Sequence, residues 1–273
     1  MPRLYGLLIA RDEADVIAQS LTFALGHCEK IICMDNMSGD GTWEIIQDMA
    51  ARHPGRIVAH RRLTETFRDS LRALAYNAFH RELSAADWWL RLDADEFLNE
   101  PPAAVLSHAN AEQADFVRAY QMTFALTELD IAAIERGEDS RDKPIEQRRR
   151  HYRVDWREFR LFRNDPGIAW DIALNPQFPQ NLSKGRIASR SIFNRHYQHR
   201  DIEQIKTRIA IRASNTAFAH VGSEDWRQYT ARAQDCHVWQ PGAPVKFSPV
   251  QDFWWPRVKL EIGQRLGRLA RPA

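Results

Sequence analysis

The chain has 273 residues, of which 44% are hydrophobic and 27% are charged, and its formal net charge is +2. This composition is typical of a globular protein that buries a core, and the near-neutral charge argues against a nucleic-acid-binding protein. The three cysteines include no Cys-x-x-Cys pair, which argues against a disulfide scaffold and a zinc cluster. We find no signal peptide and no run of about 18 apolar residues, so a cytoplasmic protein is expected.

The first hundred residues alternate between short apolar runs and amphipathic segments. The apolar runs predict strands at 4–10, 30–35, 56–60 and 88–93. The segments between them have helical spacing and predict helices at 12–27, 42–55 and 67–83. This alternation predicts an α/β fold whose mostly parallel central sheet has helices on both faces.

The pattern changes after residue 115. Alternating segments predict further strands at 115–126, 152–163 and 185–198, and helical spacing returns at 201–218. The dense charge of 135–150 favours a mobile surface loop. Residues 219–256 are rich in Trp, Pro and Gly and resist assignment, whereas 256–273 have an apolar helical face among basic residues. We therefore expect a main domain over 1–200, with halves 1–100 and 101–200, and a helical, Trp-rich extension over 201–273.

Acidic side chains follow three of the predicted parallel strands. Because ligands bind at the carboxyl ends of such strands, these residues are the first candidates for a site. Like charges gathered there raise one another's pKa unless a cation or hydrogen-bond donors intervene, and a divalent cation with substrate phosphates would do so. Taken singly, each group also fits a turn, a helix cap or a solvated strand end. The residues are Arg11, Asp12, Glu13, Asp35, Asn36, Ser38, Asp40, Thr42, Asp93, Asp95 and Glu96.

Three motifs carry a family resemblance. The segments "RDEADVI", "IICMDNMSGDGT" and "WWLRLDADEF", in this order, resemble inverting glycosyltransferases of family 2 with the GT-A fold. The later segments "RLFRN" and "RHYQHRDIEQIK" resemble that group less specifically, and Asp12 stands where the group usually has Asn. The resemblance implies a Rossmann-like GT-A fold with a C-terminal helical extension.

The resemblance also implies a reaction. A hexosyltransferase would move a sugar from a nucleotide-diphosphate sugar, with a UDP-sugar as first choice, to a glycan or lipid-linked acceptor. Synthesis of cell-surface polysaccharide or lipopolysaccharide would be its setting. Asp35 matches the acid at the nucleobase, and Asp93 would meet the ribose or a metal. The nucleotide-sugar-binding residues would be Arg11, Glu13, Asp35, Asn36, Asp93 and Ala94.

A metal ion and a base complete the implied site. Asp95 would bind Mn²⁺ or Mg²⁺, which bridges both phosphates and neutralises the leaving nucleotide diphosphate. His196 is a further candidate ligand, although a structural histidine explains it equally well. Inversion needs one base, for which Asp171 is the first candidate and Asp165 and Glu128 are alternatives. An ordinary loop acid is the competing interpretation of Asp171.

Alternative functions remain open at this point. One is a non-catalytic nucleotide- or sugar-binding module of the same fold. Another is a phosphoryl-transfer enzyme of the haloacid-dehalogenase type that uses Asp93 and Asp95, although its motif normally follows the first strand. No P-loop or GxGxxG motif occurs, and no nucleic-acid partner is expected.

The sequence also allows us to predict the positions of two side chains and of the C-terminal segment. We expect Arg72 on a solvated helix face, although it could instead reach a diphosphate. Glu96 is expected to face away from the site or to cap a turn. The basic helix at 256–273 could contact an anionic membrane surface, which would place the protein at the inner face of the membrane. Packing of this amphipathic helix on the domain explains its pattern equally well.

Overall fold

The computed structural model describes residues 2–174, 176–180, 182, 185–214 and 225–247. Nine strands form one sheet in the order β3-β2-β1-β4-β8-β6-β9-β5, with β11 paired to β8, and β7 and β10 form a separate pair. The strands are β1 (Leu4–Ala10), β2 (Lys30–Asn36), β3 (Ile57–Leu63), β4 (Trp88–Leu92), β5 (Glu96–Leu98), β6 (Phe116–Phe124), β7 (Leu126–Thr127), β8 (His151–Arg163), β9 (Ile192–His196), β10 (Thr230–Ala231) and β11 (His237–Val238). The helices are α1 (Ile17–Ala24), α2 (Thr42–Arg52), α3 (Arg72–Phe79), α4 (Ala103–Ala111), α5 (Glu128–Glu135), α6 (Ile145–Arg148) and α7 (Ile202–Ser214).

The first half of the sheet is parallel. Strands β3, β2, β1 and β4 pair in parallel, with Leu8 opposite Cys33 on one side and Leu92 on the other. All seven residues of β1 are buried, as expected for a strand covered on both faces. The carboxyl ends of β1, β2 and β4 therefore meet at one edge of the sheet.

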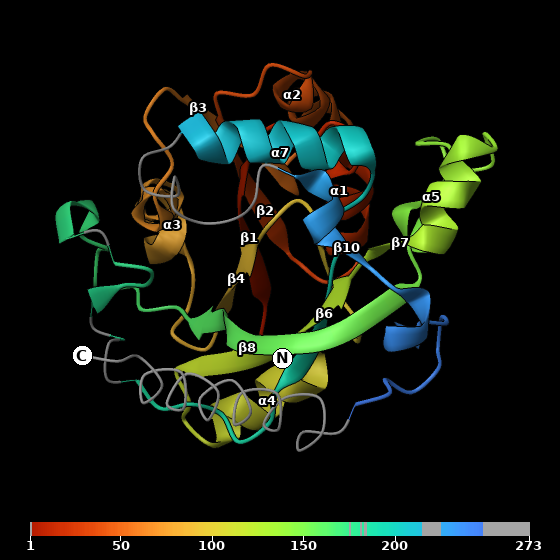
Figure 1. The fold of residues 1–273 in the computed structure, drawn as a ribbon. Coiled ribbons are helices and arrows are strands. Elements are labelled where there is room, and N and C mark those ends of the chain that lie inside the picture. The colour runs from red at the N-terminus through yellow and green to blue at the C-terminus, as the bar shows by residue number, and fades with distance from the viewer. Residues whose placement is uncertain (1, 175, 181, 183–184, 215–224, 248–273) are drawn as a thin grey trace, which may run out of the picture.

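The second half of the sheet is largely antiparallel. The 13-residue strand β8 runs antiparallel to both β4 and β6, and it crosses the molecule as the long green ribbon in Figure 1. Strand β9 lies parallel to β6 and antiparallel to β5. The strands predicted at 115–126 and 152–163 are confirmed as β6 and β8, and the third is shorter than predicted because β9 covers only Ile192–His196.

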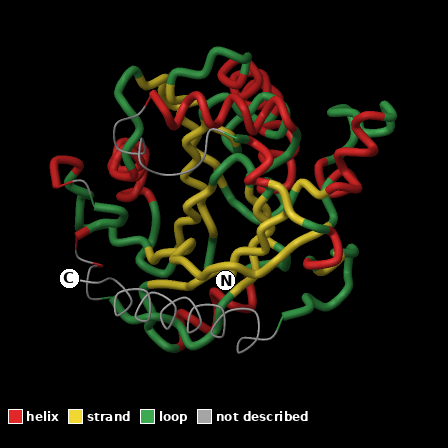
Figure 2. The backbone as a smooth tube through the Cα atoms, in the orientation of Figure 1, coloured by secondary structure: helices red, strands yellow, loops and turns green. Residues whose placement is uncertain are grey.

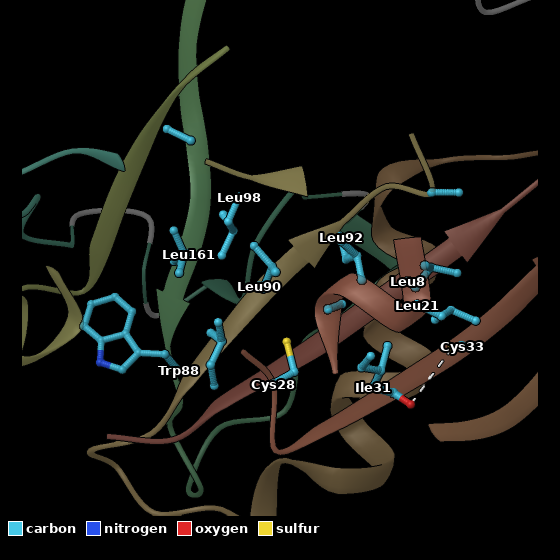
Figure 3. Close-up of a cluster of buried hydrophobic side chains, with 14 of the residues drawn as sticks. Leu8, Leu21, Cys28, Ile31, Cys33, Trp88, Leu90, Leu92, Leu98 and Leu161 are labelled. Carbon is cyan, nitrogen blue, oxygen red and sulfur yellow. Dashed lines mark hydrogen bonds between the residues drawn. The ribbon is translucent and has the colours of Figure 1, made fainter. Parts of the chain in front are cut away.

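Helices cover both faces of the sheet, which confirms the predicted α/β class. On one face, the buried side chains of α1, α2 and α4 pack on the sheet around Leu8, Trp88 and Leu90 (Figure 3). On the other face, Tyr76 of α3 packs with Trp89 of β4. Such close-packed apolar side chains hold the strand ends in fixed positions.

Helix α7 lies across the carboxyl ends of the parallel strands, where its residues face the loops that follow β1 and β2 (Figure 1). Figure 2 shows the same helix above the parallel strands. The predicted helix at 201–218 is thus confirmed over Ile202–Ser214. Residues 215–218 and the expected basic helix at 256–273 lie outside the described residues. None of the helices that the structure describes is both long and apolar enough to cross a membrane.

The prediction of a surface loop over 135–150 holds only in part, because 136–144 form neither helix nor strand whereas α6 begins at Ile145 and the following arginines are buried. The side chains of Arg148 and Arg149 are 3% and 1% exposed, and each donates to the Asp139 carboxylate at 2.7 Å. Arg148 also pairs with Asp201, which directly precedes α7, at 3.3 Å. Arg148, Arg149 and Asp139 are thus buried against one another, whereas the side chains of Arg136, Glu138 and Arg141 remain more than half exposed.

Candidate active site

The loops after β1 and β2 are joined by hydrogen bonds. The Asp12 amide donates to Ser38 Oγ at 3.0 Å, and the Gly39 amide donates to Asp12 Oδ1 at 2.8 Å. The Glu13 amide donates to Thr42 Oγ1 at 2.8 Å. The sequence motifs "RDEAD" and "DNMSGDGT" therefore form a single structural unit at the edge of the sheet.

Two residues of this unit other than glycine have a positive φ. Asp12 has φ 54° and Met37 has φ 62°. Among residues other than glycine, Asp and Asn tolerate this region best, so the Asp at position 12 is compatible with its backbone. The side chain of Asp12 then reaches the Gly39 amide across the loop.

A cavity of about 750 Å³ opens beside this unit. Its walls are the ends of β1 and β2, the two joined loops and one side of α7. The volume suits a ligand of a few hundred daltons. Its lining comprises Ile9, Ala10, Arg11, Asp12, Glu13, Ala14, Asp15, Asn36, Gly39, Asp40, Phe67, Arg141, Glu203, Gln204, Thr207, Arg208, Ile211 and Arg212.

A smaller cavity of about 270 Å³ adjoins the first at the end of β4. It contains Asp93, Ala94, Asp95 and His196, four of the residues predicted from the sequence. Both cavities are lined by Ile9, Glu13, Phe67 and Arg208. The structure therefore brings the ends of β1, β2 and β4 together around two adjoining cavities.

Arginines neutralise Asp93. Arg72 Nη2 lies 2.5 Å from Asp93 Oδ1, and Arg160 Nη1 lies 2.8 Å from Asp93 Oδ2. Burial would raise the pKa of Asp93, but Arg160, Arg72 and Arg91 hold it well below its ordinary value. The expectation of a solvated Arg72 is wrong, because its side chain is 2% exposed and faces the cavity.

Asp95 is also held by cations. Its Oδ2 lies 3.1 Å from Arg208 Nη1, 3.4 Å from His196 Nε2 and 3.8 Å from Arg200 Nη1. Burial alone would raise the pKa of Asp95, but His196, Arg208 and Arg200 lower it. Conversely, burial opposes the charged form of His196, yet the Asp95 carboxylate raises the pKa of that imidazole. In the protein as described, side-chain cations thus offset the repulsion among the acids.

Glu96 does not face away from the site, contrary to the expectation. It is 2% exposed, pairs with Arg160 and accepts a hydrogen bond from Gln121 Nε2 at 3.3 Å. Burial raises the pKa of Glu96 to about 8, against the opposing effect of Arg160. Glu96 does not line either cavity. It is one of three carboxylates that surround Arg160, together with Asp93 and Glu158.

The protein side chains provide only part of a metal site. Among the described residues, no group of three or more His, Cys, Asp or Glu side chains is placed to hold an ion. Asp95 and His196 are adjacent and would offer one oxygen ligand and, once the imidazole has lost its proton, one nitrogen ligand. Mn²⁺ accepts both ligand types, and the remaining positions suit phosphate oxygens and water. The residues thus fit a metal that arrives with a diphosphate.

The other residues assigned to the nucleotide lie near the large cavity. Arg11, Glu13 and Asn36 line it. Asp35 is fully buried behind the lining, where its Oδ2 accepts a hydrogen bond from the Ser38 amide and lies 3.2 Å from Arg62 Nε. Asp35 Oδ1 and Asn36 Oδ1 are buried and have no partner among the described residues, so both are available as acceptors to a ligand that reaches them.

The candidate bases lie elsewhere. Asp171 is exposed, and its Oδ1 accepts a hydrogen bond from the Ala173 amide at 2.9 Å. Asp165 accepts similarly from the Gly167 amide, and Glu128 from the Ala233 amide. None of the three is in the lining of either cavity. The catalytic role of Asp171 therefore stays a prediction.

Three arginines of the site, Arg160, Arg200 and Arg208, were not predicted from the sequence. Arg160 opens the quoted segment "RLFRN", and Arg200 lies in "RHYQHRDIEQIK", so both lay within segments that carry the family resemblance. Arg208 follows two residues after the second segment and had no such indication. Each is identified only by its contacts with Asp93, Asp95 or Glu13.

Glu13 gives the site a pH response. Burial and the nearby Asp95 raise its pKa to about 7 against the effect of Arg200. Between pH 4.5 and about 7, Glu13 is protonated in the folded protein but ionised in the unfolded chain. The contribution of Glu13 to the free energy of unfolding therefore decreases as the pH rises through this interval. We expect Glu13→Gln to flatten the decline in the free energy of unfolding over this interval. Urea titrations at pH 5, 6, 7 and 8 measure it, and parallel curves for the two proteins would contradict the assignment.

The sequence matches no protein-family model and none of the curated proteins. Among solved structures, "Crystal structure of S. aureus TarS 1-349" aligns with 81% of this chain and 67% of its own, at 11% identity and a TM-score of 0.41. The mannosyltransferase PcManGT from Pyrobaculum calidifontis, in complex with GDP-Man and Mn²⁺, aligns with 81% of this chain and 65% of its own, at 14% identity and a TM-score of 0.42. This chain thus spans about two thirds of each of these proteins.

Proposed function

We propose that the protein is a glycosyltransferase that uses a nucleotide-diphosphate sugar. The observation that carries the proposal is the pair of adjoining cavities: in the smaller one the Asp93 and Asp95 carboxylates lie among arginines, beside a larger one built from the ends of β1 and β2. The larger space suits a nucleoside, and the smaller one suits the charged diphosphate and the start of the sugar. The order of the three sequence motifs supports the same function.

The charges of the smaller cavity suit a diphosphate leaving group. Arg72 and Arg208 lie at its wall, and fixed cations at this position stabilise the charge that grows on the departing nucleotide. A bound Mn²⁺ or Mg²⁺, held by Asp95 and His196, would supply further Lewis-acid stabilisation of that charge. Asp93 keeps Arg72 and Arg160 in place, since it accepts from both.

We also propose the finer features that the family resemblance implies. The reaction inverts the anomeric centre, and a UDP-sugar is the first choice of donor. Asp171 is the proposed base. The acceptor is a glycan or a lipid-linked glycan, in the synthesis of cell-surface polysaccharide or lipopolysaccharide. The residues over 1–200 form the transferase domain, and 201–273 form an extension whose described helix, α7, supplies one wall of the cavity.

A thermal-shift screen tests the proposed donor. UDP-, GDP- and dTDP-sugars are each added with Mn²⁺, with Mg²⁺ and with EDTA. We expect one nucleotide class to raise the unfolding temperature by several degrees, and more so with the metal, because a ligand that binds only the folded state stabilises it. If no nucleotide sugar stabilises the protein under any condition, the proposal is wrong. Release of nucleoside diphosphate from the stabilising sugar distinguishes an enzyme from a module that only binds.

A further inference from the structure

Three cationic side chains gather around one oxygen of Asp95. Arg208 Nη1 donates a hydrogen bond to Asp95 Oδ2 at 3.1 Å, and His196 Nε2 and Arg200 Nη1 lie 3.4 Å and 3.8 Å from the same atom. Oδ2 is also the oxygen that faces His196, so a divalent ion held by both residues binds there. Because a carboxylate oxygen has two lone pairs, and because like charges repel, at least one of the other cations must withdraw when such an ion binds.

Arg200 is fixed in place. Its side chain is fully buried and pairs with the carboxylates of Glu13 and Asp15. Asp15 accepts from Arg200 Nε at 2.7 Å and from Nη2 at 2.9 Å, and the Tyr197 carbonyl accepts from Nη1 at 3.1 Å. Withdrawal of Arg200 would leave two acids without their buried partner, which is costly.

Arg208 is held less tightly. Its side chain is 26% exposed, and its hydrogen-bond acceptors among the described residues are Asp95 and the Gln198 carbonyl, the latter at 3.3 Å. It lines both of the adjoining cavities. The residue before α7, Asp201, is anchored by Arg148, so the Arg208 guanidinium can change partner while the start of the helix stays in place.

We propose that Arg208 exchanges partners when the donor binds: it holds Asp95 in the metal-free protein and turns to the diphosphate when a divalent ion takes Asp95 Oδ2. Metal binding and nucleotide binding then favour each other, because the diphosphate gives the displaced guanidinium a new anionic partner. The part played by the diphosphate rests on the proposed function. The competition between Arg208 and a divalent ion does not, since it follows from the contacts of Asp95 alone.

Titration with Mn²⁺ in the absence of nucleotide tests the competition. Electron paramagnetic resonance of free Mn²⁺ gives the dissociation constant for the wild type and for Arg208→Gln. We expect the variant to bind Mn²⁺ about tenfold more tightly, because the ion no longer displaces a charge-assisted hydrogen bond from Asp95. Adding Asp95→Asn to Arg208→Gln is expected to remove this gain. The proposal is overturned if Arg208→Gln binds Mn²⁺ no more tightly than the wild type.

A matched variant separates the exchange from a general effect of charge. Arg212 lies four residues further along α7 and lines the larger cavity, but it does not line the smaller one that contains Asp95. Arg212→Gln therefore removes the same charge from the same helix and is expected to leave the Mn²⁺ dissociation constant nearly unchanged. An equal gain in the Arg208 and Arg212 variants would show that net charge alone is responsible, and the exchange would be wrong.

A further variant guards against a folding defect. Thermal unfolding without ligand shows whether each protein is folded. Arg208→Lys keeps the charge but loses the planar donor group, so we expect it to bind Mn²⁺ with an affinity between those of the wild type and Arg208→Gln. If Arg208→Gln does not fold, Arg208→Lys takes its place, and an affinity equal to that of the wild type then refutes the competition.

A nucleotide titration measures the coupling and keeps the two proposals apart. UDP and GDP are titrated with and without Mn²⁺, and we expect Mn²⁺ to raise nucleotide affinity by a larger factor in the wild type than in Arg208→Gln. Equal factors in the two proteins would overturn the exchange toward the diphosphate. If neither nucleotide binds the wild type, the proposed function fails, and the nucleotide-free titration still decides whether Arg208 and Mn²⁺ compete.

Discussion

Asp95→Asn is expected to reduce nucleotide-sugar turnover by about a hundredfold to a thousandfold, a loss comparable to removal of one preorganised electrostatic group from an active site. Asparagine keeps the shape but not the charge, so Arg208, Arg200 and His196 lose their shared counter-ion. The amide is also a poor metal ligand. Release of nucleoside diphosphate over a series of Mn²⁺ concentrations measures both effects, and the stimulation by metal should disappear.

An independent readout accompanies this variant. Because the Asp95 carboxylate raises the pKa of His196, that pKa is expected to fall in Asp95→Asn, which NMR titration of the imidazole detects. Asp48→Asn is the matched control, since Asp48 is 62% exposed and, among the residues that the structure describes, pairs with Arg52 alone on the surface of α2. Turnover and metal response equal to the wild type in Asp95→Asn would refute the assignment of Asp95 to the site.

Arg160→Leu is expected to lower the free energy of unfolding by about 3–5 kcal/mol, the usual cost of removing one partner of a buried ionic cluster. Arg160 is 4% exposed at its side chain and pairs with Asp93, Glu96 and Glu158. Without it, these carboxylates remain close together with less compensation. Urea unfolding at neutral pH measures the change.

Two further variants check the physical reason. Arg153→Gln lies on the same strand, β8, but its side chain is 46% exposed and its acidic partner is 3.9 Å away, so we expect a loss below about 1 kcal/mol. Adding Glu158→Gln to Arg160→Leu removes a carboxylate whose pKa Arg160 lowers, and should restore part of the lost stability, as a double-mutant cycle would show. An Arg160→Leu protein within about 1 kcal/mol of the wild type would contradict the role of the cluster.

The first half of the fold is predictable from the sequence because its strands are buried on both faces. Continuous apolar runs such as 4–10 and 88–93 have few alternative structures, and helical spacing between them requires a parallel sheet. The motifs that follow these runs are then brought to one edge by the geometry of the sheet, which is why Glu13, Asp93 and Asp95 could be assigned to one site, whereas His196 was assigned through the family resemblance alone.

The partners of those acids were not predictable in the same way. Arg208 lies 113 positions from Asp95 in the chain, and Arg160 lies 67 positions from Asp93. Hydropathy patterns also treat every charged residue as exposed, which is why Arg72 and Glu96 were misplaced. A charged side chain is buried only when it meets a partner, and that depends on tertiary contacts between elements.

The hydrogen bonds between the loops after β1 and β2 affect how the site meets a ligand. Loops that order only upon binding lose conformational entropy at that moment, and the observed affinity falls accordingly. Here the backbones of Asp12, Glu13 and Gly39 are already held by the facing loop. Folding itself restricts these residues, so a ligand at this edge of the sheet meets a preorganised surface and more of its contact energy remains as affinity.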